Sequence, residues 1–462
     1  MRIEKDSIGS LKIDEEAYYG IQSLRGSNNF NVIEQRINLD FAKNIARIKK
    51  AAAKVNYEIG ALDKTKCDAI MQASQEIIDD KIDGAFIVDA IQGGAGTSAN
   101  MNVNEVIANR AIEILGGNKG DYSIIHPNDH VNMAQSTNDV IPSAAKMTVI
   151  DLMKPLVSNM ENLVDAFLEK SKEFDHIIKM GRTQMQDAVP IRLGQEFASY
   201  ASCLKRDIER IKQVEKEMHE INMGGTAIGT SINVDSLYLE KIDKEISKVC
   251  GYDVHLANDL IDATQNLDGI VNVSASIKNC GVNLGKIAGD LILMSSGPKT
   301  GFGEINLPAM QSGSSIMPGK INPVIPEVVI QVSYLLMGHD VTISMAASSG
   351  QLELNAFGPV IYYQLFEAIY ALNGAIVSFT RDCVKGITAN VEKCKENVDK
   401  SIGVITVLVP VIGYQRATEI AKEALETGVP VRDIILRENI LSKEELDKVL
   451  DPYKMTKPSN KQ

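Results

Sequence analysis

The sequence predicts a mainly α-helical protein whose middle part is a bundle of long helices. Apolar residues recur at spacings of three and four over residues 149–167, 197–221 and 360–379, which is the pattern of one buried helix face. The stretch 265–296 is typical of a further long helix. Helices of this length bury such stripes only by lying side by side, so they predict a bundle.

The chain on either side of the bundle carries shorter elements. Helical periodicity predicts helices over 39–60 and 64–81, whereas the first forty or so residues are polar, with a structured loop expected at 17–26.

The periodic pattern breaks near residues 385–393, and a small C-terminal unit follows. Short helices are expected there at 416–427 and 442–450. Ser442 is a good N-cap for the second of these, with Glu445 completing a capping box.

Composition bounds the class of protein. The 462 residues include 44% hydrophobic and 23% charged residues, as in ordinary soluble globular proteins. The net charge of −12 argues against a nucleic-acid partner. The six cysteines contain no Cys-x-x-Cys pair, so reduced thiols are expected and not a disulfide framework or a zinc site. No apolar signal core or membrane-spanning run is evident, which predicts a cytoplasmic protein without a membrane partner.

Residues 313–323 concentrate chemically active side chains in a stretch that cannot be regular structure. Two glycines and two prolines predict a loop, and it carries the hydroxyl of Ser314 and the ammonium of Lys320. A possible base beside a cation suits proton abstraction from a carboxylate substrate. A solvated turn would use similar residues, but the adjacent apolar pair Ile316 and Met317 argues against it.

Two resemblances to nucleotide-binding motifs fail on spacing and context. In a phosphate-binding loop that begins at Gly313, Pro318 would replace the second glycine and Ile321 the hydroxyl after the lysine. Residues 94–99 fit the relaxed dinucleotide fingerprint, but the polar run 100–105 is unlike the apolar face of a crossover helix. An oxidoreductase is therefore not favoured.

Three more polar clusters stand at breaks in the helical pattern, at residues 93–102, 135–139 and 181–190. With the loop at 313–323 they closely resemble the aspartase/fumarase superfamily, and within it the ammonia-lyase branch. The resemblance covers nearly the whole chain, from Tyr18 to Pro458. The loop is specific to the superfamily.

The resemblance implies a three-domain subunit with a central five-helix bundle. The expected domains are a mostly helical N-terminal domain at 1–137, the bundle at 138–390 and a small helical domain at 391–462. It also implies a homotetramer in which four bundles form a twenty-helix core, and active sites that each draw on three subunits.

The implied reaction is the reversible deamination of L-aspartate, a small dicarboxylate, to fumarate and ammonia. The β-proton is removed first, which produces an aci-carboxylate that requires donors and cations around it. No cofactor or metal is required for the chemical step, and activation by a divalent cation stays open.

The resemblance also assigns roles to residues. Ser314 would be the base, although a free hydroxyl is too weak an acid, so loop N–H groups and Lys320 would have to activate it. The other expected contacts are Thr97, Ser136, Thr137 and Ser315 to the β-carboxylate, Lys320 and Asn322 to the α-carboxylate, and Asn138, Gln184 and Thr183 around the amino group.

Gln184 discriminates between an ammonia-lyase and a hydratase. Fumarases carry His at the matching position, and an amide cannot titrate to activate water. His130 also resembles the ammonia-lyases, whereas His126 is similar to fumarases. A class II fumarate hydratase and a catalytically silent homologue therefore remain as alternatives.

Overall fold

The structure is a computed structural model that describes residues 1–82 and 84–458. It is mainly helical, and its strands form four two-stranded sheets within these residues. Two compact units are distinguished, the first being Met1–Val157, Arg210–Asn279 and Leu335–Leu372, and the second Ser158–Glu209, Cys280–Tyr334 and Asn373–Gln462.

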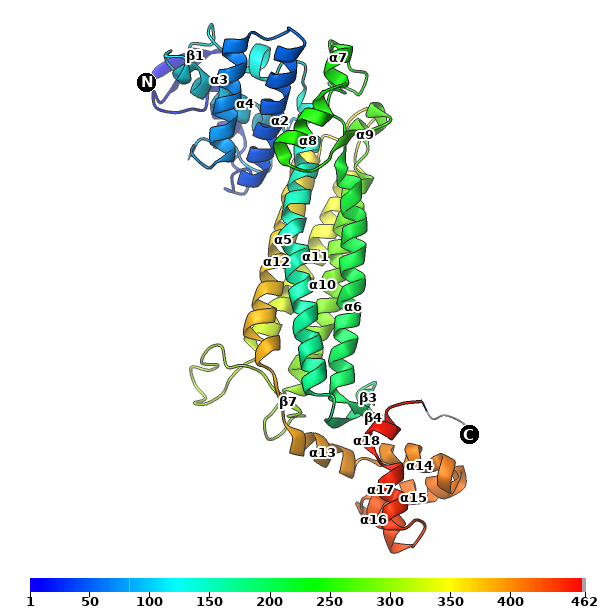
Figure 1. Cartoon of the computed structure of the whole chain (residues 1–462). Helices are drawn as coiled ribbons and strands as arrows, with labels where there is room; N and C mark the ends of the chain where they lie inside the picture. The colour runs from blue at the N-terminus through cyan, green and yellow to red at the C-terminus, as the bar shows by residue number, and fades with distance from the viewer. Residues whose placement is uncertain (83, 459–462) are drawn as a thin grey trace. The chain divides into compact units, whose positions relative to one another are not determined.

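Five long helices carry the predicted bundle. They are α5 (Thr137–Glu173), α6 (Leu193–Glu215), α10 (Asp268–Met294), α11 (Val324–Ala347) and α12 (Gly358–Asp382) (Figure 1). In unit 2, the ring of Phe167 on α5 packs 6.1 Å from those of Phe197 on α6 and Phe379 on α12. Tyr200 of α6 donates a hydrogen bond of 3.0 Å to Asp290 of α10. The bundle predicted from the apolar stripes is therefore confirmed.

Unit 1 adds the N-terminal elements and the connections beyond α6. Its elements are β1 (Arg2–Lys5), β2 (Ser10–Ile13), α1 (Ile21–Asn29), α2 (Leu39–Glu58), α3 (Lys64–Ile78), α4 (Thr97–Ile114), a short π-helix (Pro127–Val131), β5 (Glu220–Ile221), α7 (Ser236–Leu239), α8 (Ile242–Cys250), β6 (His255–Leu256) and α9 (Leu260–Gln265). The predicted helices at 39–60 and 64–81 are thus confirmed as α2 and α3.

Unit 2 adds a hairpin, the loop that contains residues 313–323, and the C-terminal helices. Its elements are β3 (Ile178–Thr183), β4 (Gln186–Arg192), β7 (Ile305–Asn306), β8 (Thr388–Ala389), α13 (Val391–Lys400), α14 (Ile405–Ile412), α15 (Tyr414–Thr427), α16 (Val431–Arg437), α17 (Lys443–Val449) and α18 (Pro452–Met455). The capping box of Ser442 and Glu445 is present at the start of α17, as predicted.

The loop predicted at 17–26 is wrong in part, because α1 begins at Ile21. The carboxylate of Glu105, on α4, accepts hydrogen bonds from the backbone N–H groups of Gly20, Gln22 and Ser23. These are donors that the first turn of a helix leaves without partners. The cap comes from a distant helix, so the local sequence does not reveal it.

The apolar stripe predicted as one helix to residue 221 also ends earlier. Helix α6 stops at Glu215, a 3₁₀ turn follows at Lys216–His219, and Ile221 lies in β5. Strand β5 pairs in parallel with β6, so Ile221 is buried through a strand contact. Spacing alone does not distinguish this from one more helical turn.

Two helical segments, Val324–Ala347 and Gly358–Gly386, are long and apolar enough to cross a membrane by length and composition. Neither is an uninterrupted apolar run, because Asp340 lies within the first and Glu367 within the second. A third of the first apolar window and half of the second are buried within the chain. Core helices of bundles pass the same test, since both environments select apolar residues.

Candidate active site

The stretch 313–323, which we call the signature loop, is closed by its own backbone in unit 2. The N–H of Gly313 donates to the carbonyl of Lys320 at 3.0 Å, and Nδ2 of Asn322 donates to the carbonyl of Gly313 at 2.7 Å. A Cβ on Gly313 would lie 2.3 Å from that Lys320 oxygen, so no larger residue fits there. Helix α11 begins directly after the loop.

Ser314 lies inside this loop with its hydroxyl oxygen facing two backbone donors. Its Oγ accepts the N–H of Met317 at 2.9 Å and of Ile316 at 3.2 Å. Hydrogen bonds to an oxygen favour its charged form, so this arrangement would stabilise a serine alkoxide. The same geometry is a common hydroxyl turn, and the two descriptions are compatible.

The remaining side chains of the signature loop are exposed in this chain. Ser315 and Lys320 are exposed, and the Lys320 ammonium has no hydrogen-bond or ion-pair partner among the described residues. Ile316 is 83% exposed. A cation without a partner among the described residues is suited to an anionic ligand.

In unit 1, Thr97 is the first residue of α4, and three residues before it have positive φ. Gly94, Ala95 and Gly96 have φ values of 82°, 57° and 95°, so a left-handed turn leads directly into the first residue of the helix. The Thr97 hydroxyl donates to the carbonyl of Gly94 at 2.7 Å.

Helix α5 starts beside α4, at the second predicted cluster. Nδ2 of Asn100 donates to Oγ1 of Thr137 at 3.3 Å, so the first turns of the two helices are joined. Ser136 Oγ accepts the N–H of Asn138 at 3.2 Å, and Nδ2 of Asn138 donates to the carbonyl of Ala227 at 2.7 Å. Two adjacent helix N-termini with hydroxyls are a favourable place for a carboxylate.

Two buried charged residues without an expected role in the site support these helix starts. Asp139 is fully buried and accepts the N–H groups of Ser136, Gly224 and Thr226. Lys49 is fully buried on α2, and its Nζ donates to Oδ1 of Asn132 at 2.7 Å. Burial raises the pKa of Asp139 to about 6 and lowers the pKa of Lys49 to about 7.

The polar run 100–105 belongs to helix α4, and its asparagine amides are buried; those of Asn100 and Asn104 donate to the side chain of Asn132, whereas that of Asn102 bonds to backbone. Asn102 donates to the carbonyl of Ala85 and accepts the N–H of Ile87, both at 2.9 Å. The asparagines therefore act as fixed connectors between a helix and its surrounding loops. The three asparagines within residues 100–105 are the feature of the sequence that indicates this buried polar network.

Thr183 and Gln184 lie at the tip of the β3–β4 hairpin in unit 2. Thr183 pairs with Gln186, which leaves Gln184 and Met185 as the two turn residues. Both have positive φ, 51° and 63°, which is the geometry of a type I′ turn but uncommon for residues other than Gly, Asn or Asp. The turn exposes both predicted side chains to solvent.

The structure thus brings Thr97, Ser136, Thr137 and Asn138 together in unit 1. Unit 2 holds the signature loop and the hairpin tip. A shared pocket for all four clusters stays a prediction.

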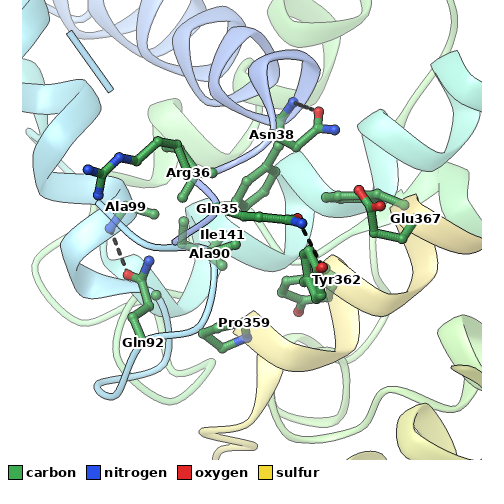
Figure 2. Close-up of a pocket in the computed structure, with 15 residues that line it drawn as sticks. Gln35, Arg36, Asn38, Ala90, Gln92, Ala99, Ile141, Pro359, Tyr362 and Glu367 are labelled. Carbon is green, nitrogen blue, oxygen red and sulfur yellow. Dashed lines mark hydrogen bonds between the residues drawn. The ribbon is translucent and has the colours of Figure 1, made fainter. Parts of the chain in front are cut away.

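A pocket of about 120 Å³ borders the start of α4 in unit 1. Figure 2 shows Gln92 reaching the first turn of α4, where its Oε1 accepts the N–H of Ala99 at 2.9 Å. The rings of Phe41 and Phe366 form an apolar wall, with centroids 5.7 Å apart. Among the described residues that line the pocket there is no predicted site residue.

Family models match two parts of the chain. Residues 9–338 match a family described as a lyase, and residues 404–457 match the C-terminus of fumarase C.

Full-length relatives are similar throughout. The chain is 50% identical to an aspartate ammonia-lyase of Bacillus subtilis over 99% of this chain and 96% of the relative. It is 51% identical to an aspartate ammonia-lyase of Helicobacter pylori over 99% and 98% of the two chains.

Solved structures agree in fold. A fumarate lyase:delta crystallin of Brucella melitensis bound to cobalt has a TM-score of 0.97 at 47% identity, covering 99% of this chain and all of its own. A class II fumarase of Schistosoma mansoni has a TM-score of 0.95 at 34% identity, with the same coverage.

Proposed function

Since the chain belongs to the lyase family of the aspartases and fumarases, we propose that it is a carbon–nitrogen lyase that converts L-aspartate reversibly to fumarate and ammonia. The observation that carries the choice within the family is the full-length identity of about half to several aspartate ammonia-lyases. The class II fumarase is less similar, at 34% identity.

Ser314 is the base in this proposal. As an alkoxide its Oγ takes the proton from C3 of aspartate, and the electron pair moves into the neighbouring carboxylate as the aci form. The C–N bond then breaks, nitrogen leaves with the bonding electrons as ammonia, and fumarate remains. The N–H groups of Ile316 and Met317 support this role, because they already donate to Oγ.

The proposed contacts of the substrate follow the charges available. Lys320 and Asn322 hold the α-carboxylate, and Thr97, Ser136, Thr137 and Ser315 receive the β-carboxylate, on which charge develops. The helix N-termini behind Thr97 and Thr137 support the second group, because the aligned peptide dipoles make a helix N-terminus electropositive.

Gln184, Asn138 and Thr183 surround the amino group in the proposal. The amide of Gln184 orients a group that leaves without a separate proton donor, whereas hydration would require a titratable side chain there. This reasoning supports deamination over hydration at the same loop. No cofactor or metal takes part in the step that we propose.

We also propose that the enzyme is a cytoplasmic homotetramer with shared sites. Helix α11 exposes Tyr334, Val341 and Met345, which recur at spacings of seven and four and therefore share a face. Tyr334 is 66% and Met345 67% exposed. A second bundle covering this face would account for its apolar character and for the exposed signature loop.

Fumarate absorbance tests the proposed substrate. The purified protein is supplied with L-aspartate and L-malate in separate reactions, without added cofactor. We expect fumarate from L-aspartate and none above background from L-malate. Fumarate from L-malate alone would overturn the proposal in favour of a hydratase, and no fumarate from either would favour a silent homologue.

A further inference from the structure

A buried ion cluster in unit 2 is not part of the proposed chemistry. Its centre is Glu304, which is fully buried and directly precedes β7, the strand from which the chain runs into the signature loop. Oε1 of Glu304 lies 2.9 Å from Nη2 of Arg182, and Oε2 lies 3.2 Å from Nζ of Lys179. Both cations belong to β3, which ends in Thr183.

The sheet geometry explains how both cations reach one carboxylate. Lys179 and Arg182 are three residues apart, so in a regular strand they would face opposite sides. The β3–β4 register shifts between Met180 and Arg182, which turns the strand and lets both side chains reach Glu304. A Cβ on the intervening Gly181 would lie 2.6 Å from the carbonyl of Val189, so glycine is required at this shift.

Other contacts hold Glu304 itself in place. Nδ2 of Asn397, on α13, donates to its Oε1 at 3.3 Å. Its backbone N–H donates to the carbonyl of Met294 at 2.8 Å, and its carbonyl accepts the N–H of Asn390 at 2.9 Å. The guanidinium of Arg182 lies 4.1 Å over the ring of Phe302. The carboxylate is therefore a fixed point between the end of α10, the loop stem and β3.

We propose that Glu304 is a positioning residue of the active site. It connects the strand that presents Thr183 and Gln184 to the stem of the loop that carries Ser314, and it sets the geometry of both elements without touching substrate. This inference rests on the proposed function, because it assumes that the hairpin tip and the signature loop act on a dicarboxylate. The carboxylate is costly to remove, since the Arg182 guanidinium then loses its carboxylate partner and the Lys179 ammonium keeps only Glu196, at 3.0 Å.

Glu304→Gln keeps the shape of the side chain and removes the charge. We expect kcat for L-aspartate to fall at least tenfold while the far-ultraviolet circular dichroism and the oligomer mass are unchanged. Glu304→Asp should recover part of this loss. Glu396→Gln is the matched control, because Glu396 also pairs with two cations, Lys393 and Lys400, but on the exposed surface of α13. It should leave kcat unchanged.

A loop reporter distinguishes positioning from a structural role. The chain contains no tryptophan, so Ile316→Trp places its one tryptophan on the exposed part of the signature loop, where it can be excited apart from the tyrosines. Succinate is used as the probe, because it has both carboxylates and no leaving group. We expect succinate to shift the emission of the Ile316→Trp protein, and the shift to require at least tenfold more succinate when Glu304→Gln is added.

Unchanged kcat together with an unchanged succinate response in Glu304→Gln would overturn the inference. If Glu304→Gln fails to fold, Arg182→Lys replaces it, because it keeps the charge but loses the planar pairing geometry. The same loss of kcat and of succinate response is expected, and normal values of both would overturn the inference. Failure of the proposed function would show separately, as absence of L-aspartate turnover in the unsubstituted protein.

Discussion

Lys49 is a charged group that the fold removes completely from water. Its ammonium donates to Asn132, which also accepts from Asn100 and Asn104, so the lysine supports the polar scaffold under Thr137. Burial lowers its pKa to about 7, whereas Asp139, with a pKa of about 6, is ionised above neutral pH. The lysine therefore titrates in the folded protein near neutrality.

This predicts how stability depends on pH. Between about pH 7 and 10 the unfolded chain keeps the Lys49 proton that the folded chain has lost, so the free energy of unfolding rises with pH. In Lys49→Met that contribution is absent, and the rise should be smaller by up to about 1.4 kcal/mol per pH unit. Urea unfolding of both proteins at several pH values above 7 measures the difference.

Lys50→Met is the control for this prediction, because the neighbouring Lys50 donates to Gln75 on the partly exposed side of α2. Its pH dependence should match that of the unsubstituted protein. Equal slopes for Lys49→Met and the unsubstituted protein would show that Lys49 does not titrate in this range.

Among the structural elements, the β3–β4 turn allows the effect of backbone geometry on stability to be measured apart from the effect of the Gln184 side chain on turnover. Gln184 and Met185 both have positive φ, which glycine adopts without strain. Met185→Gly should therefore keep or raise stability, by up to about 1 kcal/mol, with turnover retained. Gln184→Gly should be equally stable but lose turnover, since it removes the amide proposed to orient the amino group.

Thermal unfolding and fumarate formation, measured on both glycine variants, test this pair. The substitutions are identical in kind and adjacent in one turn, so each is the control for the other. Equal turnover in the two variants would remove Gln184 from the proposed site.

Elements that depend on local sequence patterns could be predicted, whereas elements that depend on distant contacts could not. The apolar stripes of α5 and α12 and the capping box of α17 are local patterns, and they were predicted correctly. Helix α1 was not, because its cap is Glu105, about eighty residues further along the chain. The loop at 313–323 was identifiable because its residue types exclude regular structure.

The supporting residues of the site could not be found in this way. Glu304 and Lys49 look like ordinary surface charges in the sequence, and only the tertiary fold buries them beside their partners. The register shift that turns Lys179 and Arg182 toward one carboxylate is likewise set by pairing with β4. Such contacts join segments that are far apart in the chain, so no local pattern encodes them.

At the scale of the whole molecule, the proposal of shared sites has a direct test in mixed oligomers. Thr97→Val, in unit 1, and Ser314→Ala, in unit 2, should each inactivate the enzyme. If one site draws the two residues from different subunits, co-assembly of the two variants in equal amounts should restore about a quarter of the activity. Half of the subunits carry an intact Thr97 and the other half an intact Ser314, so about one site in four receives both.

Two differently tagged variants, purified as mixed oligomers, supply the material for this measurement. Each parent oligomer alone gives the baseline. No recovery in mixed oligomers would mean that the two residues serve one site from the same subunit.

Fumarate formation from L-aspartate by Ser314→Ala directly tests whether the signature loop supplies the base. Ser312→Ala is the matched control, because Ser312 is an exposed serine just before the same loop. We expect Ser314→Ala to lose about 10²- to 10⁴-fold in kcat with oligomer mass unchanged, as for removal of a catalytic base, and Ser312→Ala to stay near the unsubstituted rate. Near-normal turnover by Ser314→Ala would show that the signature loop does not supply the base.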